Sequence, residues 1–561
     1  MDASFGPFWM TRKEEMFSVE GTIPGVLEIA RRKWPDKEAV VYRDQRINFA
    51  KLKELSDIAA KGFIAIGVNP GDHVGFIMGN YPQFVWLQFG VIAVGAKVVP
   101  INVSLKADEI KFILQTAEIT TLIINDHFRD IDYLTILGEM IPKYCEYEPG
   151  EVNDPSLPRL RNIIIFDSGG SSSSNVFTVD QLMDLGRQRL EGRSAPKPEP
   201  SDYAFIMFTS GTTAFPKGAI QTHRAILTGG YYSGKALSLD STDKYLCVSP
   251  FYHVAGLVTG LYSCLVHGAA LHLMEFFDAD EAAQTIAREK ITAGWGLGVM
   301  FLRIIESARR LGLDISHLKK ALIPTGGNTF EKVVKELQLE VATNSYALTE
   351  GAGPVSIMLP DDRNWEKRRN SQGRALPGIE VRIIDRKTGT RLPPGNVGEI
   401  CFRGWSNILG YYNMPEETSA AADREGFFHT QDMGEVDEEG YLYYRGRYKH
   451  IIKTGGENVS QLEVETFLED KTPWVKRAGV VGIPDRRWGE AVTALVQLKP
   501  NVVVTAEELQ NYMKGKIAGF KIPKHILLIE GHEWPLRPTK KLDKQKLRDM
   551  ALSKLGIVSR D

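Results

Sequence analysis

Thr209-Ser-Gly-Thr-Thr-Ala-Phe-Pro-Lys-Gly218 is the stretch around which the rest of the sequence can be interpreted. It follows the apolar run 203–208, which predicts a buried strand, and precedes residues 219–223, which suit a second strand or the start of a helix. Its hydroxyls, glycines and Lys217 can direct several donors and one positive charge onto a single anion. A polar surface turn would have a similar composition. Because Lys217-Gly218 closes the run after a strand, we expect a phosphate-binding loop, although the pattern is not that of a Walker loop.

The overall composition excludes several classes of protein. The 561 residues are 43% hydrophobic and 25% charged, and their formal net charge is −2. This balance, without a basic tail, argues against a nucleic-acid partner. Four scattered cysteines without a CxxC pair favour buried thiols in a reducing compartment over a zinc site or disulfides. No apolar run reaches ~18 residues and no signal peptide is recognisable, so we expect no transmembrane segment and a cytoplasmic location.

Strand-like and helix-like runs alternate along most of the chain, which predicts parallel sheets flanked by helices in two similar halves packed face to face. Beyond residue 380, strands separated by Gly, Pro and Asp turns predict a β-rich subdomain. The predicted fold class is α/β, with a large N-terminal domain over residues 1–447 and a small α+β domain over 448–561. The predicted strands include 39–42, 73–78, 97–100, 120–125, 162–166, 244–248, 270–273, 381–384, 397–402, 440–444, 477–483 and 491–498. The predicted helices include 23–33, 49–66, 84–94, 107–116, 256–266, 279–288, 461–469 and 506–517.

Two motifs after predicted strands are open to more than one interpretation. Pro250-Phe-Tyr-His-Val-Ala-Gly256 could form the wall of a pocket, but on local grounds a core histidine is the better interpretation of His253. Thr325-Gly-Gly-Asn328 carries two glycines that would let a flat ring lie against the backbone, and a plain turn fits equally well.

Asn344-Ser-Tyr-Ala-Leu-Thr-Glu-Gly351 combines three useful side chains after another predicted strand. Tyr346 can stack on a base, Thr349 can reach a phosphate, and Glu350 can hold Mg²⁺, which takes carboxylate and phosphate oxygens. A turn at the end of the strand is the alternative.

The last motifs are charged. Phe428-His-Thr-Gln-Asp432 is expected to place an acid at the end of a strand, where a carboxylate could accept both hydroxyls of a ribose. The run 444–459 is dense in Arg, Lys and Gly, and 537–544 is a basic loop for which a solvated charge run is the simpler interpretation.

Taken together and in their order, six motifs resemble those of the adenylate-forming superfamily. They are TSGTTAFPKG, PFYHVAG, NSYALTEG, HTQDMGEV, YRGRYKHIIKTGGENVS and PTKKLDK. This superfamily includes acyl- and aryl-CoA synthetases, luciferases and the adenylation domains of peptide synthetases. The resemblance extends from about residue 22 to residue 550.

The resemblance implies a two-step reaction. A carboxylate attacks the α-phosphate of ATP to give acyl-AMP and pyrophosphate, and a thiol then displaces AMP. The loop 209–218 would hold the β- and γ-phosphates through Thr209, Ser210, Gly211, Thr212, Thr213, Lys217 and Gly218.

The other nucleotide contacts are implied in the same way. Glu350 would hold Mg²⁺ and Thr349 would touch the α-phosphate. The residues expected around adenine and ribose are Gly326, Gly327, Tyr346, Asp432 and Arg447.

The resemblance also implies a mobile C-terminal domain. Lys541 matches the lysine that bridges the attacking carboxylate and the α-phosphate, where a cation stabilises the transition state. Lys449 matches the hinge about which this domain rotates between the two steps. After rotation, Gly455 and Gly456 would line the channel for the pantetheine arm of CoA.

Three residues depart from the family pattern. Ala214 and Ala347 stand where glycine is usual, and a methyl group restricts the backbone there. Lys540 also replaces a glycine, so either Lys540 or Lys541 could be the catalytic lysine.

The acid itself is less well defined. The segment 250–256 has no aspartate to bind a substrate amine, which favours a free carboxylic acid with CoA as the acceptor. His253, Trp295 and Ala347 are expected to line the acyl pocket, and Trp295 could also shorten it. We expect a medium- or long-chain fatty acid, and a monomer or homodimer. The alternatives are a cyclic or aromatic acid, or a stand-alone adenylation enzyme that uses an acceptor other than CoA.

Overall fold

The computed structural model describes residues 21–166, 176–189, 197–209, 216–448, 451–535 and 542–557. Its backbone contacts divide the chain into two compact units. The first comprises residues 1–103, 114–207 and 218–446, and the second comprises 104–113, 208–217 and 447–561. The expected domain boundary between residues 447 and 448 stays a prediction.

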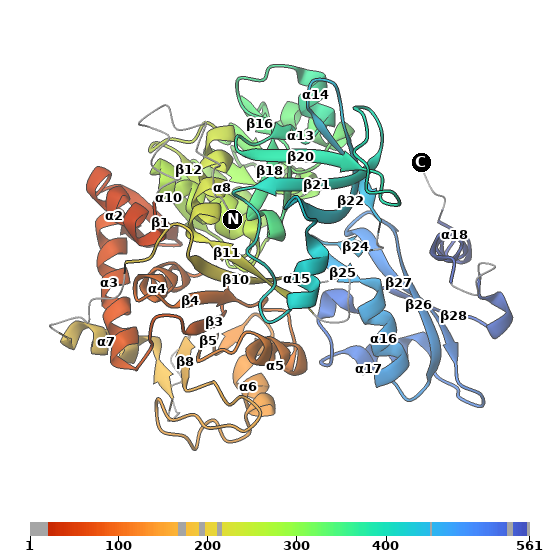
Figure 1. Cartoon of the computed structure of the whole chain (residues 1–561), viewed down its shortest axis with the longest axis horizontal. Coiled ribbons are helices and arrows are strands. Elements are labelled where there is room, and N and C mark those ends of the chain that lie inside the picture. The colour runs from red at the N-terminus through yellow and green to blue at the C-terminus, as the bar shows by residue number, and fades with distance from the viewer. Residues whose placement is uncertain are drawn as a thin grey trace. The chain divides into compact units, whose positions relative to one another are not determined.

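Two seven-stranded sheets form the framework that the labels of Figure 1 trace. The first has the order β16-β15-β14-β12-β13-β1-β2, and its strands run parallel from β16 to β1. Its members are β1 (Glu38–Tyr42), β2 (Gln45–Asn48), β12 (Lys244–Cys247), β13 (Ala270–Leu273), β14 (Ala293–Trp295), β15 (Lys320–Leu322) and β16 (Val341–Thr343).

The second sheet has the order β11-β10-β4-β3-β5-β8-β9, and the strands from β10 to β9 are parallel. Every residue of β3, β5 and β8 is buried, as expected for parallel strands covered on both faces. The members are β3 (His73–Ile77), β4 (Lys97–Pro100), β5 (Thr121–Asn125), β8 (Asn162–Phe166), β9 (Phe177–Thr178), β10 (Tyr203–Thr209) and β11 (Lys217–Thr222). A separate short hairpin is formed by β6 (His127–Phe128) and β7 (Ile131–Asp132).

Helices alternate with these strands, as the sequence predicts. Helix α3 contacts α2, α4 and α7, and these helices lie on the same side of the molecule in Figure 1. The helices of this part are α2 (Ile23–Lys33), α3 (Phe49–Ala65), α4 (Pro82–Ala93), α5 (Ala107–Thr116), α6 (Tyr133–Met140), α7 (Val179–Gln188), α8 (His223–Ala236), α11 (Ala279–Glu289), α12 (Gly298–Leu311), α13 (Gly327–Leu337), α14 (Trp365–Asn370) and α15 (Pro415–Ala421).

Two details differ from the expectation. The two alternating blocks of sequence do not correspond one to one with the two sheets, because β1 pairs with β13 of the later block, with Val40 opposite Leu271. The single helix expected over 256–266 is three segments, α9 (Val254–Gly256), the π-helix η1 (Leu257–Tyr262) and α10 (Ser263–His267).

Antiparallel strands follow, which confirms the predicted β-rich subdomain. A three-stranded sheet contains β17 (Ser345–Leu348), β18 (Gly353–Ile357) and β19 (Arg374–Ala375), and the 3₁₀ turn η2 (Thr349–Gly351) joins its first two strands. A four-stranded sheet contains β20 (Ile379–Ile384), β21 (Gly398–Gly404), β22 (Phe428–Val436) and β23 (Leu442–Arg447).

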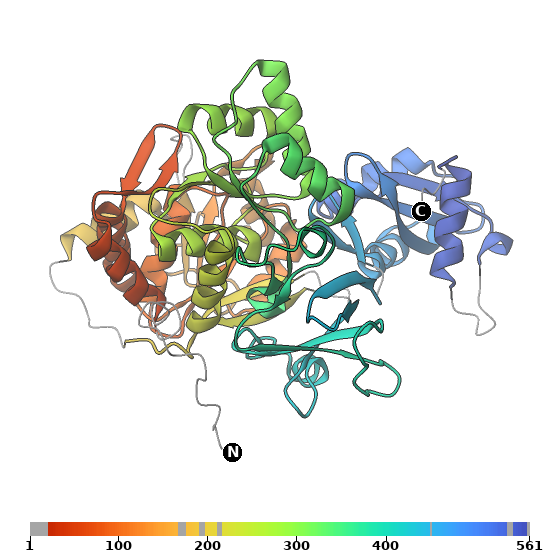
Figure 2. The same cartoon turned by 90° about the horizontal axis from the view of Figure 1, so that it is seen from above.

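The second unit has its own α+β core, drawn in blue in Figure 2. Successive residues of its central strands face opposite sides, so Val480 and Val496 enter one apolar cluster while Val481 and Leu495 enter another. Helix α17 ends at Met513 rather than near 517, and Gly515, with φ 78°, follows that end. The strands are β24 (Ile451–Thr454), β25 (Glu457–Ser460), β26 (Val475–Asp485), β27 (Gly489–Leu498) and β28 (His525–Leu528). The helices are α16 (Gln461–Lys471), α17 (Ala506–Met513), η3 (Gly519–Lys521), η4 (Gly531–Glu533) and α18 (Lys544–Lys554).

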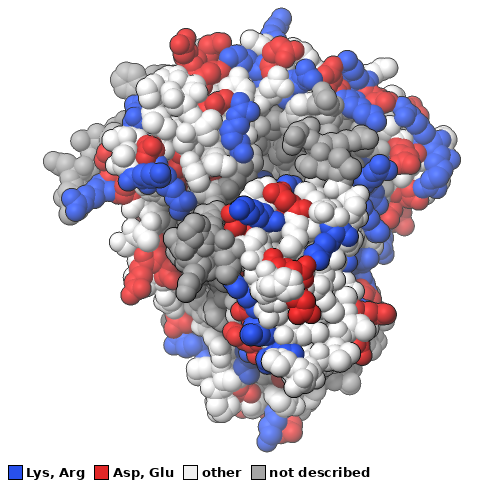
Figure 3. Space-filling view, turned by 90° about the vertical axis from the view of Figure 1, so that its right-hand side faces the viewer, with Lys and Arg blue, Asp and Glu red and all other residues white. Residues whose placement is uncertain are grey.

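Charges of both signs are mixed over the face of the molecule shown in Figure 3. This distribution accords with the formal net charge of −2. In the part of the chain that the structure describes, no helix combines the length and the apolar character needed to cross a bilayer.

Candidate functional site

The predicted motifs follow four neighbouring parallel strands at one edge of the first sheet. His253 follows β12, Trp295 ends β14, Gly326 follows β15 and Tyr346 follows β16. The strand ends are in register, with Trp295 opposite Leu322 and Leu322 opposite Thr343. Ligands of open parallel sheets bind outside the carboxyl ends of the strands, so the candidate site lies at the carboxyl ends of these four strands.

Tyr346 and Asp432, predicted from motifs far apart in the sequence, lie in direct contact. The Tyr346 hydroxyl donates a hydrogen bond of 2.7 Å to Asp432 Oδ2, and both residues are buried. The ring of Tyr444 stacks on that of Tyr346, with centroids 6.1 Å apart. An aromatic ring thus lies beside an oriented carboxylate, which is the arrangement needed to place a base and a ribose.

Asp432 does not lie at the end of a strand, and that expectation was wrong. It lies inside β22, where the pairing with β21 shifts between Glu399 and Cys401 and Gln431 adopts φ 61°. Glu399 Oε1 accepts from the Gln431 N–H at 2.9 Å, and Thr430 Oγ1 accepts from the Asp432 N–H at 3.1 Å. This bulge explains how a residue in mid-strand can turn its carboxylate toward Tyr346.

Thr349 and Glu350 occupy the turn η2. The Tyr411 hydroxyl donates to Glu350 Oε1 at 3.0 Å, and the Gln221 side-chain amide donates to the Thr349 carbonyl. Burial and the nearby Glu350 carboxylate raise the pKa of Tyr411, so its hydroxyl stays protonated as a donor. A half-buried carboxylate held in this way supplies the hard oxygen that Mg²⁺ prefers.

The two glycines after β15 leave space at the backbone. Gly327 has φ 67°, which favours glycine, and a Cβ on it would meet no atom within 4 Å. A Cβ on Gly326 would come no closer than 3.4 Å to another residue, at the Arg369 carbonyl. The Thr325 hydroxyl accepts from the Gly298 N–H at 3.1 Å, which connects this loop to the one that follows Trp295.

A small apolar cavity in the core, with room for about one water molecule, is lined in part by Trp295 and is too small to be the acyl pocket that the sequence suggests. His253 and Ala347 are absent from its described lining, and Ala347 is exposed. Their roles in acyl binding stay predictions. The cavity is lined by Leu246, Val248, Ile286, Gly294, Trp295, Gly296, Met300, Phe301, Ile304 and Leu318.

The phosphate loop is described only at its two ends. Thr209 ends β10, and β11 begins with Lys217 and Gly218. Four expected contacts and the departure from the family pattern lie outside the described residues, namely Ser210, Gly211, Thr212, Thr213 and Ala214.

The C-terminal predictions are described in part. Lys449, Lys540 and Lys541 lie outside the described residues, and Arg447 is the last residue of β23. Gly455 and Gly456 have φ 59° and 88° and form the two-residue turn between β24 and β25.

Asn80 is a residue near the site that the sequence reasoning missed. It lies three residues beyond β3 and is buried. Its side chain donates to the Ser249 carbonyl at 2.8 Å and accepts from the Phe251 N–H at 3.0 Å. The loop that carries His253 is therefore held by the amide of one asparagine. A polar residue three positions after a mostly apolar strand was the signal that could have found it.

Comparisons with known proteins agree with this geometry. Residues 27–412 match the family model described as AMP-binding enzyme, and residues 463–541 match the AMP-binding enzyme C-terminal domain. The chain is 30% identical to the putative acyl-CoA synthetase YngI of Bacillus subtilis (strain 168), over 96% of this chain and 99% of that protein. It is 31% identical to the human protein named medium-chain acyl-CoA ligase ACSF2, mitochondrial, over 96% of this chain and 88% of that protein.

Solved structures share the fold. A double mutant of o-succinylbenzoate CoA synthetase (MenE) from Bacillus subtilis has a TM-score of 0.77 at 24% identity, with 94% of this chain and 99% of that chain covered. A fatty acyl CoA synthetase of Mycobacterium tuberculosis has a TM-score of 0.65 at 26% identity, with 95% and 99% covered. The family matches and the full-length relatives lead to one conclusion: the chain belongs to the AMP-binding enzyme family, in the acyl-CoA synthetase branch of the adenylate-forming superfamily, and is an AMP-forming ligase.

Proposed function

We propose that this enzyme joins a medium- or long-chain fatty acid to CoA. The acid and ATP give an acyl-adenylate and pyrophosphate, and the CoA thiol then attacks the acyl carbon and releases AMP. The substrate class is supported by the relative named medium-chain acyl-CoA ligase, which matches over 96% of this chain.

The observation that carries the adenylation step is the contact between Tyr346 and Asp432. In the proposed complex the base lies against the Tyr346 ring, and Asp432 accepts the ribose hydroxyls. Glu350 holds Mg²⁺ among the phosphate oxygens, and Thr349 contacts the α-phosphate. The loop 209–218 holds the pyrophosphate, and Lys541 neutralises charge at the reacting phosphorus.

The remaining assignments belong to the same proposal. Arg447 contacts the ribose, Gly326 and Gly327 lie against adenine, and Gly455 and Gly456 line the route of CoA. The cytoplasmic location, and the monomer or homodimer, stay predictions from the sequence.

The test is pyrophosphate release from ATP with a panel of acids, with and without CoA, followed by mass spectrometry of the thioester. Fatty acids of increasing chain length are compared with benzoate-type and alicyclic acids. We expect the highest kcat/KM with a fatty acid and a product whose mass is that of its CoA thioester. Pyrophosphate release that needs no acid would contradict the ligase assignment for this chain. So would the absence of release with every acid of the panel.

A cyclic or aromatic acid is the second candidate. The observation that favours it is Trp295 at the end of β14, a bulky residue that would shorten a channel for a long chain. The same panel decides between the two, because an aromatic acid should then exceed every fatty acid in kcat/KM.

A further inference from the structure

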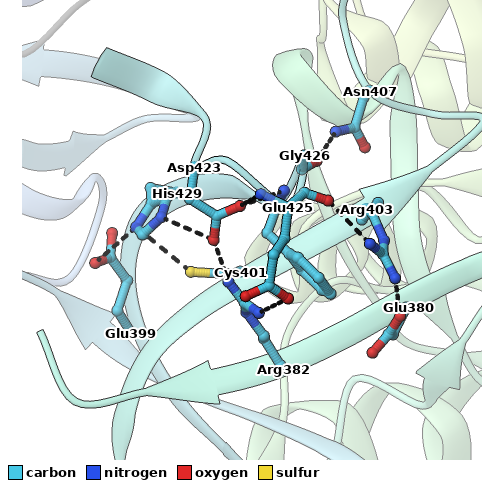
Figure 4. A network of polar contacts seen from close by, with 11 residues as sticks. Glu380, Arg382, Glu399, Cys401, Arg403, Asn407, Asp423, Glu425, Gly426 and His429 are labelled. Carbon is cyan, nitrogen blue, oxygen red and sulfur yellow. Dashed lines mark hydrogen bonds and ion pairs between the residues drawn. The ribbon is translucent and has the colours of Figure 1, made fainter. Parts of the chain in front are cut away.

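Three possible metal ligands gather on one face of the four-stranded sheet (Figure 4). Cys401 of β21 is paired directly with His429 of β22 in the antiparallel ladder. Side chains two residues apart on a strand share a face, so Glu399 projects from the same side of β21. Figure 4 shows His429 directed toward both the Glu399 carboxylate and the Cys401 sulfur.

Two of the three distances between the donor atoms are close to those of a tetrahedral zinc site. His429 Nδ1 lies 3.6 Å from Cys401 Sγ and 3.5 Å from Glu399 Oε2, and the three atoms lie within 4.8 Å of one another. With zinc bonds of about 2.3 Å to sulfur and about 2.0 Å to nitrogen and oxygen, tetrahedral angles separate sulfur from nitrogen by about 3.6 Å and nitrogen from oxygen by about 3.3 Å.

We propose that Glu399, Cys401 and His429 bind a zinc ion, with water as the fourth ligand. On binding, the Cys401 thiol loses its proton to solvent and the thiolate bonds to the metal. A thiolate, an imidazole and a carboxylate together suit zinc better than Mg²⁺, which prefers oxygen ligands alone. The site is separate from the Mg²⁺ proposed at Glu350, and its test does not depend on the proposed function.

The groups around the cluster suit this role. Asp423 Oδ2 lies 3.6 Å from His429 Nε2, whereas the other two ligands lie near Nδ1. A carboxylate on the second nitrogen fixes the orientation of a ligating histidine, as in many zinc sites. Asp423 is itself paired with Arg382, whose guanidinium lies over the Phe427 ring at 3.7 Å.

Charge and access are also compatible with a metal. The Glu399 carboxylate and a Cys401 thiolate together balance the two charges of Zn²⁺, and Arg382 balances Asp423. Cys401 and Glu399 are buried, whereas the side chain of His429 is 27% exposed, which gives an ion a route from solvent.

The sequence argued against a zinc site because its cysteines are scattered without CxxC spacing. That argument covers ligands that lie close together along one chain segment. Here two ligands come from one strand and the third from the next, and 28 residues separate Cys401 from His429. Only the strand pairing brings them together.

The experiment uses the full chain, stripped of metal with a chelator and then titrated with Co²⁺ as a spectroscopic substitute for zinc. We expect one Co²⁺ per chain, a thiolate-to-cobalt charge-transfer band in the near ultraviolet, and loss of this band when Zn²⁺ is added. Cys401→Ser should lose the band, and His429→Gln should weaken Co²⁺ binding at least tenfold. The matched control is Cys264→Ser, which removes another buried thiol and should keep the band.

Several results would overturn the proposal. They are a wild-type protein without a thiolate band, an unchanged band in Cys401→Ser, or loss of the band in the Cys264→Ser control. Thermal melting with and without Zn²⁺ gives a second measurement. Zn²⁺ should raise the Tm of the wild type and of Cys264→Ser but not that of His429→Gln. If Cys401→Ser fails to fold, the wild-type spectrum and the His429→Gln titration still decide.

Discussion

At the scale of single residues, the hydrogen bond from Tyr346 to Asp432 is the contact on which the proposed nucleotide binding depends most directly. Tyr346→Phe keeps the ring and removes only the hydroxyl. Asp432 would then lose a buried partner, and a hydrogen bond to a charged group contributes about 1.5–3 kcal/mol. If about 1.4 kcal/mol of this free energy is lost from ATP binding, the KM for ATP should rise by about tenfold, since that energy corresponds to a factor of ten. The measurement is steady-state kinetics with ATP as the varied substrate.

The chain supplies a matched control for this change. The Tyr441 hydroxyl donates to Asp362, which is a bond of the same chemical kind. Tyr441→Phe should lower the Tm without changing the KM for ATP. Equal effects of the two substitutions on that KM would show that Tyr346 acts through general stability.

His223 gives a second prediction at this scale. It is buried, its Nδ1 accepts from the Ile23 N–H at 3.2 Å, and burial lowers its pKa to about 4. Between pH 6.5 and 4 the unfolded chain therefore binds a proton at this position that the folded chain does not. Stability should fall as the pH falls through this window and level off below it. The contribution is at most about 3.5 kcal/mol, at about 1.4 kcal/mol per pKa unit.

The variant for this test is His223→Gln, which can still accept the hydrogen bond but does not titrate. The free energy of unfolding is measured in urea from pH 7.5 to pH 4. Its change over this range should be smaller in the variant than in the wild type, by the contribution of one titrating group. Buried His272, whose pKa is also lowered to about 4, will keep part of the slope. Exposed His532, changed to Gln, serves as the control and should leave the slope unchanged. Equal slopes in the wild type and His223→Gln would refute this account.

At the scale of helices and strands, the regular elements were predictable because each has a strong apolar pattern. The helix over 23–33 and the strands over 97–100 and 162–166 were predicted with their observed bounds. The bulge at Gln431 was not predictable. It depends on Glu399 of the neighbouring strand, and no periodicity within residues 428–436 reports that contact.

The candidate site shows the same division. Motifs predicted which residues are placed after β12, β15 and β16, because loops at strand ends carry recognisable glycines and aromatics. The contact between Asn80 and the loop after β12 depends on how two sheets approach each other, so it required the structure. The cluster of Glu399, Cys401 and His429 depends on strand register and was likewise hidden.

The helix that follows the predicted catalytic loop carries a third prediction. Lys544, the first residue of α18, forms an ion pair with Glu465 of α16 and donates to the Val480 carbonyl at 3.1 Å. Burial raises the pKa of Glu465 and lowers that of Lys544, which shows that each charge is costly here and is retained through its partner. Glu465→Gln leaves the lysine unpaired and should reduce the free energy of unfolding by about 3–5 kcal/mol.

A double-mutant cycle separates the pair from its surroundings. The combination Glu465→Gln with Lys544→Met should be less destabilised than Glu465→Gln alone, because no unpaired charge remains. The control is Lys554→Met, which breaks the more exposed pair with Glu533 and should cost less than about 1 kcal/mol. Urea unfolding of the full chain measures Glu465→Gln, Lys544→Met, the double variant and the control, and additive effects of the two substitutions would contradict the ion-pair account.

At the scale of the whole molecule, the sequence predicted a large α/β part with a β-rich subdomain and a separate α+β part. The strand orders of the two large sheets were beyond its reach, because pairing β1 with β13 joins segments about 230 residues apart in the chain. The roles expected of Lys449 as the hinge and of Lys541 as the catalytic lysine of the first step rest on the motif resemblance alone. Their roles therefore call for kinetic tests of the separate steps.

Lys541 is predicted to serve the first step and not the second. A cation between the carboxylate and the α-phosphate offsets the charge that builds up during adenylation, whereas thioester formation uses an adenylate that already exists. Lys541→Ala should therefore lower the rate of acid-dependent ATP–pyrophosphate exchange by at least about a thousandfold. Each factor of ten corresponds to about 1.4 kcal/mol of activation free energy. The same variant, given the synthetic acyl-adenylate and CoA, should form acyl-CoA at a rate close to that of the wild type.

Lys540→Ala is the matched control, because it removes the adjacent charge and should retain both half-reactions. Full exchange in Lys541→Ala with loss in Lys540→Ala would transfer the catalytic role to Lys540, and equal loss of both half-reactions in Lys541→Ala would show that the two steps share one arrangement of the C-terminal domain.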